Sequence, residues 1–175
     1  MGILEKLRPT PRWKHADPSV RAAAVYEIGP EEGDALRALA REDADARVRR
    51  AAVTRLDEAA VLADVARTDP DEEVRTEAIR GLAGLAAERK SLFVPVRLLC
   101  DVDELCHRVA DPSRAAMLKA ISPEHARKRM AEYSVLNPEH PHLCTIDVTH
   151  KSPDESADVI LNHVQALSSG KSQND

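Results

Sequence analysis

The chain has 175 residues, 43% of them apolar and only 2% aromatic, and carries a formal net charge of −5. Its core must therefore come from Ala, Leu, Val and Ile, which favours closely packed helices over a β-sandwich or barrel. Neither half is basic, with 16 basic against 18 acidic residues up to residue 90 and 9 against 12 beyond it. Charge alone thus gives no reason to expect nucleic-acid binding.

The cysteines and the N-terminal residues indicate the cellular compartment in which the protein is expected. Three cysteines, Cys100, Cys106 and Cys144, are too few for a disulfide framework and fit a reducing environment. Residues 1–8 hold too few apolar side chains for a signal peptide, and Lys6 stands where a myristoylation site needs Ser or Thr. No run approaches the ~20 apolar residues that span a bilayer. We therefore expect a cytoplasmic protein that does not bind membranes.

One five-residue phrase occurs three times in the first half of the chain. Residues 17–21, 45–49 and 71–75 all read Asp-x-x-Val-Arg, and their valines are 28 and 26 residues apart. Such a period is typical of stacked helical pairs. Each Asp is predicted to cap the helix that follows, because its carboxylate can accept from the first free backbone N–H groups.

Apolar residues recur at helical spacing after each cap. They are Val20, Ala23, Ala24 and Ile28, then Val48, Ala51, Ala52 and Leu56, then Val74, Ala78, Ile79, Leu82 and Leu85. Small Ala side chains let the three helices lie side by side. A second helix is predicted in each of the first two repeats, over 31–42 and 57–67. Trp13 is predicted to cover the open end of the stack, with an exposed, partner-binding Trp13 as the alternative.

The phrase resembles the short HEAT-like repeats of the phycobilisome-lyase type. Residues 11–21, Pro-Arg-Trp-Lys-His-Ala-Asp-Pro-Ser-Val-Arg, look like the N-terminal HEAT region of a bacterial family of long, charged proteins of unknown function. The resemblance covers residues 8–88 and implies a short α-solenoid whose Val-Arg helices line a concave face. By that implication the candidate partner-binding strip is Ala22, Tyr26, Arg50, Thr54, Thr76 and Arg80. A merely solvated helix face is the alternative.

The charged residues of the phrase are predicted to form a structural ladder, in which each Arg reaches the Asp of a neighbouring repeat. The ladder consists of Asp17, Arg21, Asp45, Arg49, Asp71 and Arg75. An anion site is the alternative, and we favour the ladder because paired, partly buried charges are commonly structural.

A different pattern begins near residue 91. The apolar runs 93–100 and 143–149 are predicted strands. Helices are predicted from Asp101 onward, over 113–120, over 122–133 and over 152–167. This order indicates an α/β fold with two parallel strands.

The predicted fold class is therefore mainly α. A short HEAT-like α-solenoid over 1–90 is followed by a small, incomplete α/β module over 91–167. The polar residues 168–175 are predicted to be a disordered tail.

The second half carries its own resemblance. Residues 93–101, 105–119 and 145–155 look like the closing portion of small P-loop kinases of the gluconate and shikimate kinase type. In that family basic lid residues meet the phosphates of ATP bound with Mg²⁺, and Arg108, Arg114 and Lys119 occupy corresponding positions. The phosphate-binding motif Gly-x-x-x-x-Gly-Lys-Ser/Thr does not occur in this sequence.

Six cysteines and histidines of the second half are possible zinc ligands: Cys100, Cys106, His107, His140, His142 and Cys144. However, Cys100 ends one predicted strand and Cys144 begins the other. In a parallel pair they would lie at opposite ends, about 13 Å apart, too far for one tetrahedral site. We expect buried thiols and loop histidines, no metal, and no catalytic residue.

The leading hypothesis is a non-enzymatic protein-interaction or scaffold module without a cofactor. The alternative is a nucleotide-binding or kinase-related protein that takes its phosphate-binding loop from a partner, with ATP and Mg²⁺ as ligands. A third reading is a chance fusion of two gene fragments. A protein partner is expected, and a second copy of the chain is one candidate for covering the edges of the short sheet.

Overall fold

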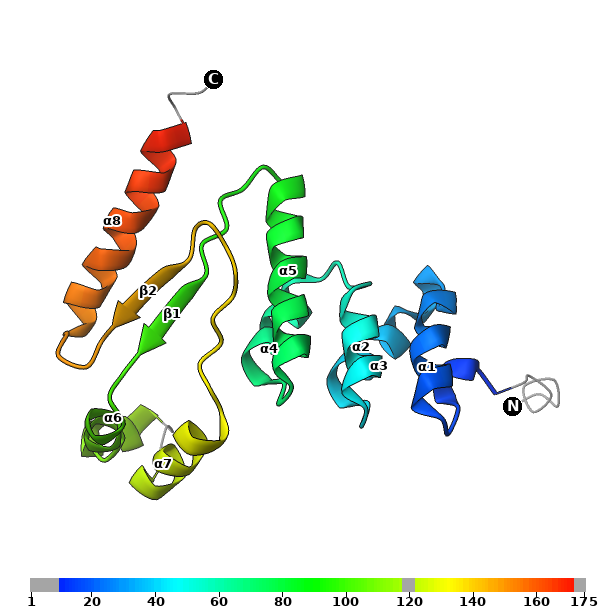
Figure 1. Ribbon diagram of the computed structural model, residues 1–175, viewed down its shortest axis with the longest axis horizontal. Coiled ribbons are helices and arrows are strands. Elements are labelled where there is room, and N and C mark those ends of the chain that lie inside the picture. The colour runs from blue at the N-terminus through cyan, green and yellow to red at the C-terminus, as the bar shows by residue number, and fades with distance from the viewer. Residues whose placement is uncertain (1–9, 118–121, 172–175) are drawn as a thin grey trace. The chain divides into compact units, whose positions relative to one another are not determined.

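The protein is described from a computed structural model, which covers residues 10–117 and 122–171. The chain divides into two compact units, Met1–Ser91 and Leu92–Asp175, and each is described by itself (Figure 1). The sequence pattern places the change of organisation one residue earlier.

The first unit is built from helical pairs. Its helices are α1 (Pro18–Ala24), α2 (Gly33–Glu42), α3 (Ala46–Val53), α4 (Ala59–Thr68) and α5 (Glu72–Glu88), with 3₁₀ turns at Arg12–Lys14, Val25–Glu27 and Pro30–Glu32. The helices α1, α3 and α5, which carry the repeated phrase, pack on one another in succession. Helix α2 packs on α3, and α4 packs on α5, so the repeated helices form one layer and their partners lie against it.

The layer helices begin at the predicted capping residues. Each capping carboxylate accepts a hydrogen bond from a backbone N–H in the first turn, one of the donors that a helix leaves unpaired. The pairs are Asp17 with the Ser19 N–H at 2.8 Å, Asp45 with the Arg47 N–H at 2.9 Å, and Asp71 with the Val74 N–H at 3.1 Å. The three predicted helix starts are therefore confirmed.

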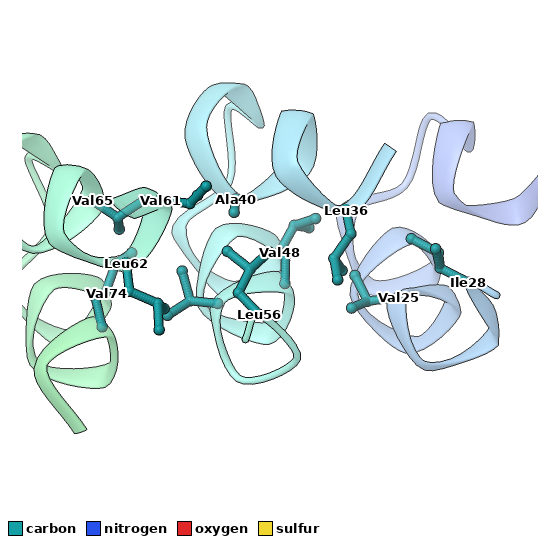
Figure 2. Close-up of a cluster of buried hydrophobic side chains, with 13 residues drawn as sticks. Val25, Ile28, Leu36, Ala40, Val48, Leu56, Val61, Leu62, Val65 and Val74 are labelled. Atoms are coloured by element: carbon teal, nitrogen blue, oxygen red, sulfur yellow. The ribbon is translucent and has the colours of Figure 1, made fainter. Parts of the chain in front are cut away.

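One apolar cluster runs through the whole first unit (Figure 2). Its best buried large side chains are Leu62, Val25, Val48, Val53 and Val74, each below 2% exposure. Trp13, in the turn that packs on α1, lies half-buried against this cluster, as expected of a residue that covers the end of the stack. Short aliphatic side chains fill the space between the helices because almost no aromatic residues are present.

The predicted apolar stripe of the first repeat is partly wrong. Ala23 is exposed and Val20 is half-buried, whereas Val25, outside the predicted stripe, is fully buried. Helix α1 ends at Ala24 and the chain continues as the 3₁₀ turn Val25–Glu27. Val53 of the second repeat holds the position that Val25 holds in the first, five residues after the repeated valine, and it is buried within the continuous helix α3. In both repeats the inward positions are therefore four and five residues after that valine, not three and four.

The second unit contains a two-stranded parallel sheet. Strand β1 (Val96–Leu99) pairs with β2 (Cys144–Asp147), Val96 lying opposite Cys144 and Leu99 opposite Asp147. The parallel pairing confirms the prediction, although both strands are shorter than their apolar runs. Helices α6 (Val102–Val109) and α7 (Pro123–Glu132) pack on each other, and α8 (Pro153–Lys171) packs on β2. The observed class is thus mainly α with a small, incomplete sheet.

Two predicted boundaries in this unit change. The helix expected over 113–120 is a 3₁₀ turn over Pro112–Met117, and residues 118–121 lie outside the described residues. The tail expected from Ser168 is wrong up to residue 171, because α8 continues to Lys171. Ser168 and Ser169 donate their hydroxyls at 2.9 Å to carbonyls four residues earlier, which satisfies these polar side chains within the helix.

Candidate functional site

The candidate strip lies on the layer formed by α1, α3 and α5. Its members stand two and six residues after each repeated valine. Tyr26 is 64% exposed, Arg50, Thr54 and Arg80 are also exposed, and Ala22 and Thr76 are half-buried. Ala22 packs against the apolar cluster, so it supports the layer more than it presents a surface.

A hollow of ≈ 470 Å³ is formed by α3 and α5. Three of its lining residues belong to the predicted strip, namely Arg50, Thr76 and Arg80. The others are Glu72, Glu73 and Glu77, which the sequence prediction did not include. The helical spacing of Glu77 and Arg80, three residues apart on one face, was an available signal for that pair.

Both arginines of the hollow are held by glutamates. Arg50 of α3 pairs with Glu73 of α5, so this ion pair joins two repeats. Arg80 pairs with Glu77 one turn earlier in α5. The Arg50 and Arg80 side chains are 48% and 67% exposed, so water screens both pairs. Each guanidinium can therefore exchange its glutamate for a carboxylate or a carbonyl of a bound partner at small cost.

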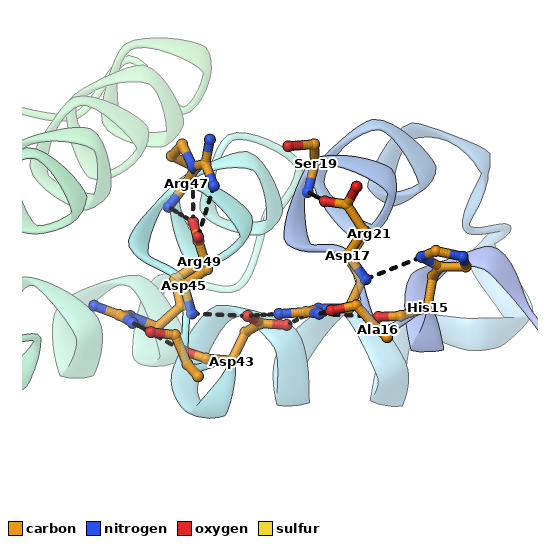
Figure 3. A network of polar contacts seen from close by, with 10 residues as sticks. His15, Ala16, Asp17, Ser19, Arg21, Asp43, Asp45, Arg47 and Arg49 are labelled. Atoms are coloured by element: carbon orange, nitrogen blue, oxygen red, sulfur yellow. Dashed lines mark hydrogen bonds and ion pairs between the residues drawn. The ribbon is translucent and has the colours of Figure 1, made fainter.

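The predicted ladder exists, but its acidic members differ from those expected (Figure 3). Arg21 donates to both carboxylate oxygens of Asp43 at 2.8 Å, and Arg49 donates to those of Asp69 at 2.7 and 2.9 Å. Asp43 and Asp69 lie in the loops that lead into the next repeat. The expected partners of the arginines, the Asp residues at 17, 45 and 71, are instead occupied as helix caps.

Each ladder arginine also binds the loop before its own helix. Arg21 donates through Nη1 to the His15 and Ala16 carbonyls, both at 2.9 Å. Arg49 donates through Nη1 to the Asp43 carbonyl at 2.8 Å. Arg75 makes the same kind of contact with the Asp69 and Pro70 carbonyls at 2.9 and 3.1 Å. Arg21 and Arg49 thus each join two successive inter-helix loops, and Arg75 holds the loop before α5, which is a structural role.

The residues missed in the ladder share a position. Asp43 and Asp69 each stand two residues before a capping Asp and accept that residue's N–H at 2.9 and 2.8 Å. His15 stands at the same place in the first repeat, and its Nδ1 accepts the Asp17 N–H at 3.0 Å. The repeated phrase is therefore two residues longer than Asp-x-x-Val-Arg, with an acceptor side chain at its first position.

The loop carboxylates respond to these contacts. Burial raises the pKa of Asp43. The hydrogen bonds that its carboxylate accepts from Arg21 and from the Asp45 N–H have the larger combined effect, so the pKa lies below its usual value. The hydrogen bond from Arg47 lowers the pKa of Asp45 to about 2. Both groups are therefore ionised at neutral pH.

Another arginine, which the repeated phrase does not include, joins the second repeat to the first. Arg55 donates through Nη1 to the carbonyls of Val25 and Ile28 at 2.6 and 2.9 Å. These carbonyls belong to the 3₁₀ turn after α1 and to its C-cap, so Arg55 of the second repeat holds the chain where it leaves the first.

The three candidate nucleotide-lid residues differ in their surroundings. Arg108 donates to Glu104 at 2.7 Å and to the Val148 and Thr149 carbonyls at 2.8 and 3.0 Å, so its donors are directed at the loop after β2. Arg114 is half-buried in the turn after α6. Lys119 lies outside the described residues.

The three thiols lie apart from one another in the second unit. Cys144 lies opposite Val96, four residues before Cys100, so these two thiols occupy opposite ends of the sheet. Cys106 is buried between α6 and α7, where its thiol lies 3.4 Å from the Pro123 carbonyl. Within residues 10–117 and 122–171, no group of three or more His, Cys, Asp or Glu side chains is arranged to hold a metal ion.

The sheet of the second unit leaves apolar side chains in water. Val96 and Leu98 of β1 are 41% and 50% exposed, whereas their β2 partners Cys144 and Ile146 are buried. Paired residues in a parallel sheet point to the same face, so α8 covers the β2 side of this face and leaves the β1 side open. That a second copy of the chain covers this open part of the sheet remains a prediction.

Comparisons with protein-family models, with curated proteins and with solved structures found no match. The HEAT-like and kinase-like resemblances therefore rest on the residues quoted for them. In the described part of the chain, no helix has the length and apolar content that crossing a bilayer requires.

Proposed function

We propose that the protein is a non-enzymatic interaction module of HEAT-like architecture, and that a protein partner binds the solvent-facing side of α1, α3 and α5, where the candidate strip lies. The observation that carries this proposal is the hollow of ≈ 470 Å³ on α3 and α5, which three of the six strip residues line. Binding sites are commonly concave, so a depression at this place supports a binding surface.

The chemistry of this face fits a polar partner segment with a few anchoring contacts. Tyr26 offers a large, exposed aromatic side chain, and arginine and tyrosine are the residue types most often found at the energetic centres of interfaces. Arg50 and Arg80 provide donors, and Glu72, Glu73 and Glu77 provide acceptors, so the hollow can pair with both charges. The ladder arginines Arg21 and Arg49 are internal and paired, so they are not counted among the partner-binding residues.

The test is a quantitative pull-down from a lysate of the organism that encodes the protein. The double variant Arg50→Glu/Arg80→Glu is compared with Arg41→Glu/Arg67→Glu on α2 and α4. Both doubles change the net charge equally, and each removes two ion pairs, with Glu73 and Glu77 in the first and with Asp64 in the second.

The proposal predicts that the first double loses a partner that the wild type and the second double both retain. Equal recovery of all partners by the two doubles would remove the strip as the binding site. Calorimetry with Mg-ATP distinguishes the interaction module from the kinase-related alternative. The alternative predicts heat of nucleotide binding, and the interaction module predicts none.

A further inference from the structure

Three histidines of the second unit form a connected group around the start of β2. His140 and His142 lie in the loop before β2, and His163 lies on α8. All three residues are half-buried, and the ring centroids of His140 and His142 are 5.2 Å apart. The ring of Phe93, from the segment before β1, meets the His140 ring edge-on at 5.3 Å.

The hydrogen bonds of His142 join three segments of the unit. Its Nδ1 lies 3.1 Å from the Phe93 carbonyl, and its own carbonyl lies 3.1 Å from His163 Nε2. The start of β1 and helix α8 are thus both tied to the start of β2 through one residue. The backbone N–H of His142 donates to His140 Nδ1 at 3.1 Å, which fixes the turn that positions His142.

The partners determine which ring nitrogens carry protons. A carbonyl only accepts, so His142 Nδ1 and His163 Nε2 must each carry a hydrogen. The His142 N–H only donates, so His140 Nδ1 must be unprotonated and its hydrogen must lie on Nε2. Protonation of His142 or His163 leaves their bonds to carbonyls intact. Protonation of His140 places a second hydrogen against the His142 N–H and removes that bond.

We propose that the His140 turn is an acid-sensitive latch, in which protonation of His140 releases His142 and loosens the hold of the β2 start on α8 and on the segment before β1. Among the described residues, the titratable group that faces His140 is His142 from its own loop. The segment before β1 contributes the uncharged Phe93 ring, and His163 of α8 contacts the His142 carbonyl.

The surroundings of His140 favour its neutral form. Burial and the neighbouring His142 lower the pKa of His140 below its usual value. A histidine with a lowered pKa in the folded state contributes stability that is present at neutral pH. That stability is lost as the pH falls from the unfolded pKa of about 6.5 toward the folded one.

The experiment compares the full-length wild type with His140→Asn and His125→Asn by amide hydrogen exchange at pH 7.5 and 5.0. An Asn side chain accepts an N–H two residues on, as His140 Nδ1 does, but does not titrate. His125 is an exposed residue of α7 whose ring makes no hydrogen bond within the described part of the chain, so its replacement is the matched control.

The amides of Leu143 and Cys144, which donate to the carbonyls of His140 and Pro95, report on the latch. Their protection factors are expected to fall about fivefold at pH 5.0 in the wild type and in His125→Asn, the effect of losing one net hydrogen bond. They are expected to stay constant in His140→Asn. An equal fall in all three proteins would overturn the proposal.

Histidine-ring nitrogen NMR of the wild type tests the same point without a variant. At pH 7.5 the His140 ring is expected to carry its hydrogen on Nε2. A hydrogen on Nδ1 at that pH would contradict the geometry from which the latch is inferred.

Discussion

Replacing Arg49 by Met removes the best buried ion pair of the first unit while keeping most of the aliphatic length of the side chain. The Arg49 and Asp69 side chains are 9% and 4% exposed, and two hydrogen bonds of 2.7 and 2.9 Å join them. The variant leaves the Asp69 carboxylate buried with the Asp71 N–H as its remaining donor, at 2.8 Å. It also removes the donor to the Asp43 carbonyl.

Breaking one side of a buried pair costs about 3–5 kcal/mol, because an uncompensated charge stays in a poorly hydrated site. We therefore expect Arg49→Met to lower the free energy of unfolding of the first unit by that amount. Adding Asp69→Asn removes the stranded charge, so the double variant should recover at least about 1 kcal/mol of the loss. Arg67→Ala, which removes an exposed pair within α4, should change stability little.

The assay is urea unfolding followed by the fluorescence of Trp13, the only tryptophan, which reports on the first unit. A cost below about 1 kcal/mol for Arg49→Met would refute the reasoning. So would a double variant that is destabilised by the full sum of the two single variants.

Two further predictions concern α5 and the loop carboxylates. Gly84→Ala should raise the free energy of unfolding by about 0.5–1 kcal/mol, because no atom beyond the adjacent residues and the helix's own backbone lies within 4 Å of the added Cβ. Gly81→Ala should gain less or lose stability, since its Cβ would lie 3.1 Å from Leu62 Cδ1; equal gains in urea unfolding would contradict this account. Because the pKa of Asp43 is lowered by folding, its contribution is present above the unfolded pKa and is lost as the pH falls below it. Acid titration of Asp43→Asn should therefore show a smaller loss of stability below pH ~4 than the wild type, and parallel curves would count against the pairing with Arg21.

The helices of the first unit were predictable because their signals are local. A capping Asp and a valine three residues later lie within one turn, so the phrase alone determines where α1, α3 and α5 begin. The phase error at Ala23 arose because Ala23 and Ala24 are adjacent small residues, and only Ala24, with Val25 after it, faces inward. The spacing of apolar residues alone does not distinguish two such neighbours.

Contacts between distant segments were harder to predict. The ladder was expected from repetition, yet its acidic partners were misassigned because a carboxylate that caps a helix and one that binds a guanidinium look alike in sequence. The group around His142 depends on the strand register and on the position of α8, which bring together residues 21 and 49 positions apart. Sequence spacing carries no information about such a meeting point.

The most direct measurement of the binding claim is photo-crosslinking from single positions on opposite layers of the first unit. A photoreactive residue replaces the exposed Thr54 at the end of α3 in one protein, and the exposed Ala63 of α4 in another. The account predicts a discrete crosslinked partner from position 54 that position 63 does not give. The same partner captured equally from both positions, or from position 63 alone, would contradict it.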